Sequence, residues 1–336
     1  MLYNLTNQFK NKLCHQYMDS LDRKKVAVTG CAGFIGSHIC KQLLDAGAIV
    51  TGLDNLARDN ANNLAGLRTH PNFTFRLGDI RDAQLLDELC HGMDFVDHQA
   101  AVCIRYCQGH QQDAIDVNVK GTINVLEACV NNKVKKIVAA SSASVYGDPL
   151  ELPIREEDPL LAKNLYGLTK IMNEEAYEYY WREHGLPFVA FRYMNVYGPK
   201  QNTDAFYTSV IPLFIKSIMN NQPPTITGDG SQTMDFVHVN DVARANVMAL
   251  ANDCCPDFYN VGTGTETNIK QVCDMLLSLM KSKLKPIYKQ ANSIDVNHRR
   301  SDITRIMSEL KWKPEINLSD GLQTVINDIQ VRSRDS

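Results

Sequence analysis

The chain has 336 residues, a formal net charge of −3 and an apolar content of 44%. This length suits two lobes or one large α/β unit, and the composition is that of an ordinary globular protein. The slightly acidic balance excludes a global basic field for nucleic acid. Because no stretch approaches the length of a membrane span and residues 1–25 lack the apolar core of a signal peptide, we expect no membrane association and a cytoplasmic protein.

The ten cysteines are scattered without a CxxC pair, which is typical of reduced thiols. Cys103 and Cys107 are four residues apart, with His98 and His110 nearby, so this stretch could be a metal site. Reduced thiols are the better explanation, and we predict no metal.

A phosphate-binding turn is predicted near the start of the chain. Residues 24–29 form a short apolar stretch typical of a strand, which leads through Gly30, Gly33 and Gly36 into a helical pattern over residues 37–46. The glycines permit a tight turn and close approach of a pyrophosphate to the backbone. The helix N-terminus adds N–H groups and partial positive charge. Strand, turn and helix in this order predict a dinucleotide-binding site.

The second strand, residues 49–53, ends at Asp54, eighteen residues beyond Gly36. An acidic residue at this place binds the hydroxyls of the adenosine ribose. Because a carboxylate repels a 2′-phosphate, we predict NAD rather than NADP, although Arg58 could soften that repulsion.

The α/β alternation continues along the chain. We predict strands at residues 73–77, 95–98, 136–140 and 188–192, and helices at 83–90, 111–131 and 165–183. Strands joined by helical crossovers form a parallel sheet with the site at the C-terminal ends of the strands. Gly78-Asp79-Ile80 could lie along an adenine, and Gln99-Ala100-Ala101 are small enough for a cofactor to approach.

Beyond residue 195, longer loops rich in Pro and Gly predict a smaller lobe, whereas a helix at 239–251 and a strand at 258–261 return to the sheet. The predicted fold class is α/β, a Rossmann-like doubly wound parallel sheet with a smaller C-terminal substrate-binding lobe. We expect a helical extension at residues 1–22, with a helix over 3–21. The NAD-binding domain is expected at 23–195, joined by 237–262, and the substrate-binding lobe mainly at 196–336.

Tyr166 and Lys170 are candidate catalytic residues. A phenol and an ammonium four residues apart share one face of a helix. The lysine charge can stabilise a phenolate and lower the pKa of the tyrosine from ~10 toward neutrality. Alone, the pair is more often part of a plain amphipathic helix. After a glycine turn, Asp54 and the strand-end Ser142, we predict that Tyr166 is the base and Lys170 its electrostatic partner.

Together these motifs, with Arg192-Tyr-Met-Asn195-Val-Tyr-Gly-Pro199 and Trp312-x-Pro314, resemble the extended short-chain dehydrogenase/reductases. They are most similar to the nucleotide-sugar 4-epimerases of the UDP-glucose, UDP-N-acetylglucosamine and UDP-glucuronate group. The resemblance implies that Tyr166 takes the proton from the sugar 4-hydroxyl while C4 gives hydride to NAD, and that the 4-keto sugar turns and is reduced on its other face. Lys170 would also bond the nicotinamide ribose, and Ser142 the 4-oxygen.

The resemblance also implies binding residues. For NAD they are Gly30, Gly33, Phe34, Ile35, Gly36, Asp54, Asn55, Asp79, Ile80, Gln99, Ala100, Ala101, Asn118, Ser141, Tyr166, Lys170 and Met194. For the nucleotide-sugar substrate they are Ser142, Ser144, Tyr166, Asn195, Ser209, Val210 and Arg299. The family further implies a homodimer through the helices at 110–131 and 165–183, where Tyr177, Tyr179, Tyr180 and Trp181 supply either aromatic interface or core packing.

Related enzymes use the same 4-keto intermediate for other products. The 4,6-dehydratases carry an Asp-Glu pair where this chain has Ala143 and Ser144, and the UDP-glucuronate decarboxylases carry a Glu at the position of Ser144. Because a 4-keto sugar with no second acid or base nearby can only be re-reduced, we predict plain epimerisation. A lyase is the alternative, followed by a net NAD(P)-dependent reductase and a non-catalytic dinucleotide sensor.

Two departures from the family leave the nucleotide and the sugar open. The arginines that usually bond the diphosphate are Met234 and Asn297 here, and charge-assisted hydrogen bonds are the stronger class. Arg299 and Arg300 are candidates to substitute, with a solvated basic run as the alternative. Arg299 could instead contact a uronate carboxylate, as an arginine does in the matching stretch of the decarboxylases.

Overall fold

The computed structural model describes residues 20–58, 61–202, 209–253, 256–290 and 298–334. The predicted helix over residues 3–21 lies almost entirely outside the described residues, and Asn297 also lies outside them.

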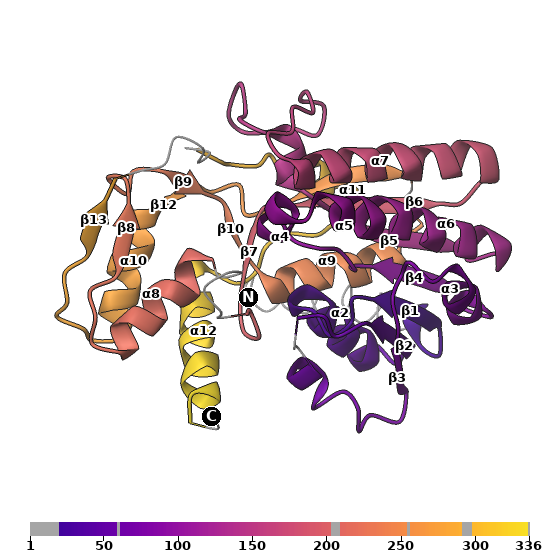
Figure 1. Ribbon diagram of the computed structural model, residues 1–336, viewed down its shortest axis with the longest axis horizontal. Coiled ribbons are helices and arrows are strands. Elements are labelled where there is room, and N and C mark those ends of the chain that lie inside the picture. The colour runs from indigo at the N-terminus through magenta and orange to yellow at the C-terminus, as the bar shows by residue number, and fades with distance from the viewer. Residues whose placement is uncertain (1–19, 59–60, 203–208, 254–255, 291–297, 335–336) are drawn as a thin grey trace, which may run out of the picture.

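A seven-stranded sheet forms the centre of the larger lobe (Figure 1). Its order is β11-β6-β5-β4-β1-β2-β3, and every neighbouring pair is parallel. The chain leaves β1 in one direction and returns to β4 on its other side, which creates the crevice where such sheets bind ligands. The predicted fold class, a Rossmann-like parallel sheet, is confirmed. The strands are β1 (Lys25–Thr29), β2 (Ile49–Asp54), β3 (Phe73–Leu77), β4 (Phe95–His98), β5 (Lys136–Ser142), β6 (Phe188–Tyr193) and β11 (Asp257–Val261).

Helices cover both faces of this sheet. On one face α2 (Phe34–Asp45) packs against α9 (Val239–Ala251), and on the other α6 (Gly121–Asn131) packs between α3 (Ala83–Cys90) and α7 (Leu165–His184). Successive strand residues point to opposite faces, so Val26 and Val28 join the core under α2 and α9 whereas Ala27 joins the core under α6 and α7.

One predicted helix, residues 111–131, is three pieces. The short α5 (Gln111–Asp113) continues into a π-helical stretch, η2 (Ala114–Lys120), and then into α6. Asn118 lies in that stretch with its side chain fully buried, where its amide bonds both the N–H and the C=O of Val102. Such π turns are inserted where a side chain must be re-aimed. The preceding α4 (Ile104–Gly109) was not predicted.

The smaller lobe is built on three helices, α8 (Val210–Met219), α10 (Ile269–Leu279) and α12 (Leu318–Arg332), which share a separate apolar core. It stands beside the larger lobe in Figure 1. β11 leaves this part of the chain and pairs with β6 of the main sheet. The short strands form two-stranded sheets, β7 (Asn195–Tyr197) with β10 (Phe236–His238), β9 (Thr233–Met234) with β12 (Thr267–Asn268), and β8 (Thr225–Thr227) with β13 (Ile287–Lys289). The remaining elements are η1 (Ala61–Leu64), η3 (Ala143–Tyr146) and α11 (Thr304–Glu309).

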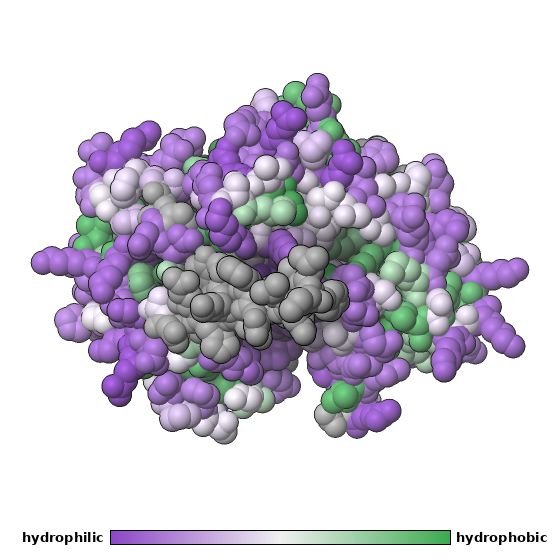
Figure 2. All heavy atoms as spheres, turned by 180° about the vertical axis from the view of Figure 1, so that it is seen from behind, coloured by the Kyte–Doolittle hydropathy of each residue, from purple (hydrophilic) through white to green (hydrophobic). Residues whose placement is uncertain are grey.

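The face in Figure 2 is mainly hydrophilic, with apolar residues scattered over it. None of the helices in the described parts of the chain is long and apolar enough to cross a membrane.

β4 carries a buried carboxyl, Asp97, beside the buried imidazole of His98. Asp97 is fully buried, and its Oδ1 accepts a hydrogen bond from Gln99 Nε2 at 2.7 Å. Its Oδ2 has no hydrogen-bond partner among the described residues. Burial raises the pKa of Asp97 to about 7. The folded protein therefore holds this proton more tightly than the unfolded chain does.

We expect Asp97→Asn to stabilise the protein at pH 8. The raised folded-state pKa means that the ionised carboxyl opposes folding above the unfolded pKa, with the full penalty present only above pH 7. The amide can still accept from Gln99 and carries no charge, so the free energy of unfolding should rise on the order of 2 kcal/mol at pH 8 and much less at pH 5. Urea unfolding at both pH values measures this, with exposed Asp22→Asn as control. An equal effect of Asp97→Asn at both pH values would contradict it.

Candidate active site

A cavity of about 390 Å³ lies at the C-terminal edge of the sheet. Its walls come from the segments that follow β1, β2, β3 and β4, from the end of β5 and from α7. The structure brings most of the predicted cofactor residues together here. Those that line the cavity are Gly30, Gly33, Phe34, Ile35, Gly36, Asp54, Asn55, Asp79, Ile80, Gln99, Ala100, Ala101, Ser141, Tyr166 and Lys170.

The glycine turn needs glycine for steric reasons. Gly30 has φ +70°, and a Cβ there would lie 2.7 Å from the backbone N of Ala100. A Cβ on Gly36 would lie 2.2 Å from the carbonyl oxygen of Gly30. Because these neighbours are backbone atoms that cannot move aside, positions 30 and 36 must lack a side chain for the turn to close. The N-cap of α2, Gly33, makes no side-chain cap, which leaves the first N–H groups of the helix for an anion.

Asp54 is fixed at the cavity wall by two backbone donors. Its Oδ2 accepts from Ala32 N at 3.0 Å and its Oδ1 from Leu56 N at 2.8 Å. Burial raises the pKa of this carboxyl, although these hydrogen bonds oppose the shift. A glycine-lined turn with a carboxylate at the end of β2 fits the pyrophosphate and the adenosine ribose of NAD.

Asp79 and Arg81 form a second polar group at this end of the cavity. Arg81 Nη2 donates to Asp79 Oδ2 at 2.8 Å, and Asn55 Nδ2 donates to the same oxygen at 2.9 Å. The hydrogen bond from Arg81 lowers the pKa of Asp79 to about 2. Asp79 is therefore ionised at neutral pH, and it presents fixed acceptors at the end of β3.

The Tyr166–Lys170 pair lies at the other end of the cavity. Asn164 Oδ1 caps α7 by accepting from Gly167 N at 2.9 Å, which starts the helix just before Tyr166. Lys170 Nζ donates to the carbonyl oxygen of Ala140 at 2.7 Å and lies 5.7 Å from the centre of the Tyr166 ring. Both side chains line the cavity, on the same helix face.

Burial is the main cause of the pKa shifts of both Tyr166 and Lys170. It lowers the pKa of Lys170 to about 8, with Glu174 acting in the opposite direction. It raises the pKa of Tyr166 to about 12, while the contact with the Ser142 hydroxyl acts to lower it. In the protein without ligands, burial therefore opposes the phenolate of Tyr166. The role of Lys170 in stabilising that phenolate stays a prediction.

Apart from Tyr166, the residues predicted around the sugar, together with Met194, which was predicted to bind NAD, lie in segments outside the cavity lining. Ser142 Oγ donates to Ser144 Oγ at 3.1 Å and accepts from Ser144 N, so it caps η3. The N–H groups of Met194 and Asn195 bond Val261 and Asp235. None of these residues lines the cavity.

Three further predicted residues lie apart from the cavity lining. Asn118 is buried behind the wall and holds Val102, which does line the cavity. The predicted contact of Asn118 with the cofactor stays a prediction. Ser209 and Val210 begin α8 in the smaller lobe and also lie outside the cavity lining.

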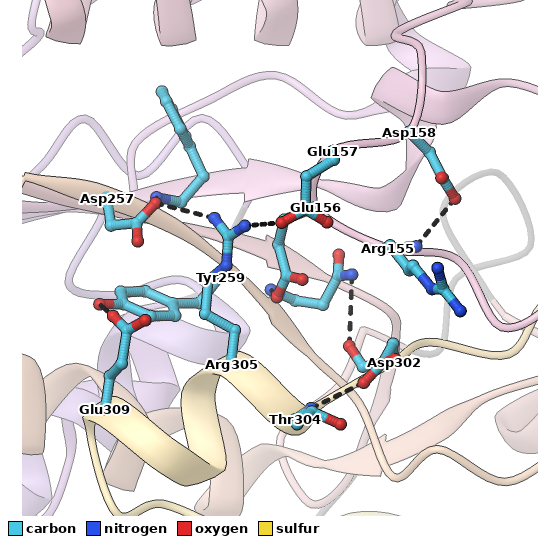
Figure 3. Close-up of polar contacts among 12 residues, drawn as sticks. Arg155, Glu156, Glu157, Asp158, Asp257, Tyr259, Asp302, Thr304, Arg305 and Glu309 are labelled. Carbon is cyan, nitrogen blue, oxygen red and sulfur yellow. Dashed lines mark hydrogen bonds and ion pairs between the residues drawn. The ribbon is translucent and has the colours of Figure 1, made fainter.

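Hydrogen bonds to Asp235 hold the stretch that carries Arg299 in place. Fully buried Asp235 accepts from Ser301 Oγ at 2.6 Å and from Ser301 N at 3.1 Å. Ile154 pairs with Ser301 as an isolated bridge. Figure 3 shows the neighbouring ionic contacts, in which Arg305 reaches both Glu157 and Asp257. Arg299 Nη2 itself donates to the carbonyl oxygen of Gly147 at 3.3 Å.

Sequence reasoning missed part of the wall. Tyr106 lines the cavity from α4, stacks on His110 with ring centres 4.1 Å apart, and donates to Asp113 Oδ2 at 2.7 Å. The spacing of Tyr106 and His110, four residues apart, was the available signal, but α4 is too short to show a periodic pattern. Gly78, which the sequence placed along the adenine, also lines the cavity. Other lining residues not predicted as cofactor contacts are Leu53, Ala57, Arg58, Arg81, Val102, Cys103, Asp113, Val117, Ala140 and Tyr193.

The described residues contain no group of three or more His, Cys, Asp or Glu arranged to hold a metal ion. Cys107 is buried, and its thiol donates to the carbonyl oxygen of Val102 at 3.8 Å.

A glycine turn, a ribose-side carboxylate and a Tyr–Lys helix around one cavity define a dinucleotide-dependent enzyme on a Rossmann-like sheet. The NAD dependent epimerase/dehydratase family matches residues 26–262. The chain belongs to this family.

Known proteins are similar over nearly the whole chain. The putative UDP-glucose 4-epimerase of Methanocaldococcus jannaschii is 39% identical, over 92% of this chain and 99% of its own length. The UDP-N-acetylglucosamine 4-epimerase of Methanobrevibacter ruminantium, solved with UDP-N-acetylmuramic acid, has a TM-score of 0.89 at 31% identity, over 93% and 99% of the two chains. The UDP-glucuronic acid 4-epimerase of Bacillus cereus, solved with UDP-glucuronic acid and NAD, has a TM-score of 0.83 at 30% identity, over 92% and 99%.

We expect Tyr166 to remain a neutral phenol in the cofactor-free protein at pH 9, because burial raises its pKa to about 12. The difference in ultraviolet phenolate absorbance between the wild type and Tyr166→Phe, followed from pH 7 to 11, measures this. The two titration curves should coincide up to about pH 10. A wild-type phenolate signal that appears near pH 8 and is absent from the variant would contradict it.

Proposed function

We propose that the protein is an NAD-dependent epimerase that inverts C4 of a UDP-activated hexose. The observation that carries this is that Tyr166 and Lys170 line the cofactor cavity while neither of the two positions after Ser142 carries an acid. Of the carboxylates that line the cavity, Asp54 ends β2, Asp79 follows β3, and Asp113 lies near Arg81 and Tyr106. Positions 143 and 144, next to Ser142, are Ala and Ser.

The residues of the chain have distinct parts in this reaction. Bound NAD would supply a hydride acceptor that also returns the hydride. The phenol oxygen of Tyr166 takes the proton of the sugar 4-hydroxyl and later gives it back. Lys170 offsets the negative charge that the phenol then carries, in a buried site where charge interactions are strong. Ser142 donates a hydrogen bond at the same sugar oxygen.

Arg299 favours a sugar that carries a negative group. Its guanidinium is partly buried beside the turn at Gly147, and burial lowers its pKa, with Asp148 acting in the opposite direction. Met234, in β9, supplies no cation to the diphosphate. We therefore place a uronate or the diphosphate at Arg299. The same observation supports the second candidate, a UDP-glucuronate decarboxylase.

We expect the purified protein to interconvert gluco and galacto forms of one UDP-sugar without net consumption of NAD, and Tyr166→Phe to lose at least about 100-fold in kcat, because general acid–base catalysis contributes that much. Products from UDP-glucose, UDP-N-acetylglucosamine and UDP-glucuronate, and from GDP-, CDP- and dTDP-sugars, are separated by chromatography. Carbon dioxide release from UDP-glucuronate would establish the decarboxylase instead. Failure to epimerise any sugar of this panel would refute the proposal.

We also propose that two copies pair through α6 and α7. Leu168, Met172 and Tyr179 are 47%, 40% and 50% exposed, and their spacing places them on one face of α7. Ile123 on α6 is 37% exposed. Tyr177 and Tyr180, which the sequence left open between interface and core, are buried in the core.

We expect the double substitution of Leu168 and Met172 by Glu to give a monomer, because two charges would then be buried in an apolar interface. Light scattering after size-exclusion chromatography measures the mass of the particle. Ile287→Glu, at a 46% exposed apolar site on β13 of the other lobe, is the matched control and should leave the mass unchanged. A wild-type chain that is already monomeric at micromolar concentration would refute the pairing.

A further inference from the structure

Glu174 continues the catalytic face of α7. It follows Lys170 by four residues, as Lys170 follows Tyr166, so the three side chains share one side of the helix. Glu174 is 3% exposed. An acid this deeply buried needs partners for its charge.

Two partners hold the carboxylate of Glu174. Arg192 in β6 donates two hydrogen bonds to it, from Nε to Oε1 at 3.0 Å and from Nη2 to Oε2 at 2.7 Å. Ser141, which lines the cofactor cavity, donates its hydroxyl to Oε1. The carboxylate thus connects a buried ion pair to the wall of the cavity.

Arg192 also donates hydrogen bonds to groups that lie behind the cavity. Its Nη1 donates to Tyr146 Oη at 2.9 Å and to the carbonyl oxygen of Glu156 at 2.8 Å. Tyr146 in turn donates to Asn260 Oδ1 at 2.8 Å. A buried ion pair is weak evidence for stability, because desolvation offsets its attraction. The Glu174–Arg192 ion pair instead connects the cavity wall to the segment after η3, where it can influence the reaction.

Of the charged groups near Lys170 in the described residues, Glu174 acts most strongly to raise the pKa of the ammonium, from four residues along the same helix face. The other titratable groups around the ammonium are Tyr166 on α7, Cys107 on α4 and His98 on β4, with Arg192 on β6 beyond Glu174. Burial keeps these groups neutral, because it raises the pKa of Tyr166 and Cys107 and lowers that of His98 to about 3.

We propose that Glu174 is a positioning residue for this active site: its carboxylate keeps the ammonium of Lys170 charged and turns the Ser141 hydroxyl away from the cavity. Without it, a larger fraction of Lys170 would be a neutral amine at pH 8, and the neutral form cannot offset the phenolate charge of Tyr166. The effect on Lys170 is independent of the substrate, whereas its catalytic consequence rests on the proposed function.

The first test measures Lys170 directly in the cofactor-free protein. An NMR titration follows the ε-carbons of labelled lysines, and Lys170→Gln identifies the signal. We expect the midpoint of Lys170, about 8 in the wild type, to fall by at least about one pH unit in Glu174→Gln, as loss of a nearby opposite charge requires. Glu175→Gln is the matched control, since Glu175 is exposed on the same helix. An unchanged midpoint in Glu174→Gln overturns the proposal.

The second test uses the NAD-loaded enzyme. In Glu174→Gln the alkaline limb of the pH profile of kcat should move to lower pH by the same amount. The kcat at pH 8 should then fall about fivefold, while the KM for the sugar stays unchanged. Glu174→Asp keeps the charge and should keep the limb in place. A purely structural role would lower kcat equally at all pH values and overturns the proposal. A wild type without epimerase activity would refute the proposed function and leave the titration to decide the role of Glu174.

Glu174→Gln leaves Arg192 without its anion, and this variant could fail to fold. The double variant Glu174→Gln/Arg192→Met removes both charges and serves in its place. The lowered midpoint of Lys170 should persist in it, because the anion that raised the pKa of the ammonium is still missing. A double variant in which Lys170 titrates as in the wild type overturns the proposal.

Discussion

The active site depends on one constraint, the burial of two ionisable groups whose reaction requires charge. In the proposed reaction Tyr166 becomes an anion and Lys170 remains a cation, and the loss of water opposes both. The direction of each pKa shows this, upward for the phenol and downward for the ammonium. The surrounding contacts act against that penalty. Ala140 accepts from the ammonium, and the Ser142 hydroxyl meets the phenol.

The sheet makes this arrangement possible because parallel strands end at a common edge. β1 and β2 deliver the glycine turn and Asp54, while β5 delivers Ser141 and Ser142 at the same level. Since α7 packs against β5, its buried face places Lys170 over the end of that strand. The cofactor end and the chemical end of the cavity are therefore separated by the width of β4 and β1.

Much of this could be predicted from sequence because its causes are local. Strand, glycine turn and helix follow one another within the first described residues, and the spacing of Tyr166 and Lys170 is a property of one helix. The parts that escaped prediction have non-local causes. The π turn at Asn118 exists because its amide reaches Val102, a loop outside its own helix. The raised pKa of Tyr166 arises from burial that only the folded chain creates. Tyr106 reached the wall through α4, which is too short for a periodic signal.

Buried hydrogen bonds connect the catalytic-side strands of the sheet to the stretch that carries Arg299. A continuous set of hydrogen bonds leads from Ser141 through Glu174 and Arg192 to Tyr146 and Asn260. Asn260 then donates to the carbonyl oxygen of Ile154, whose strand-like bridge to Ser301 fixes the segment after Arg299. Each member is buried, so a shift of the sugar-side segment would leave polar groups unpaired, at a cost of about 1–3 kcal/mol for each group. The position of Arg299 is thereby tied to the position of α7.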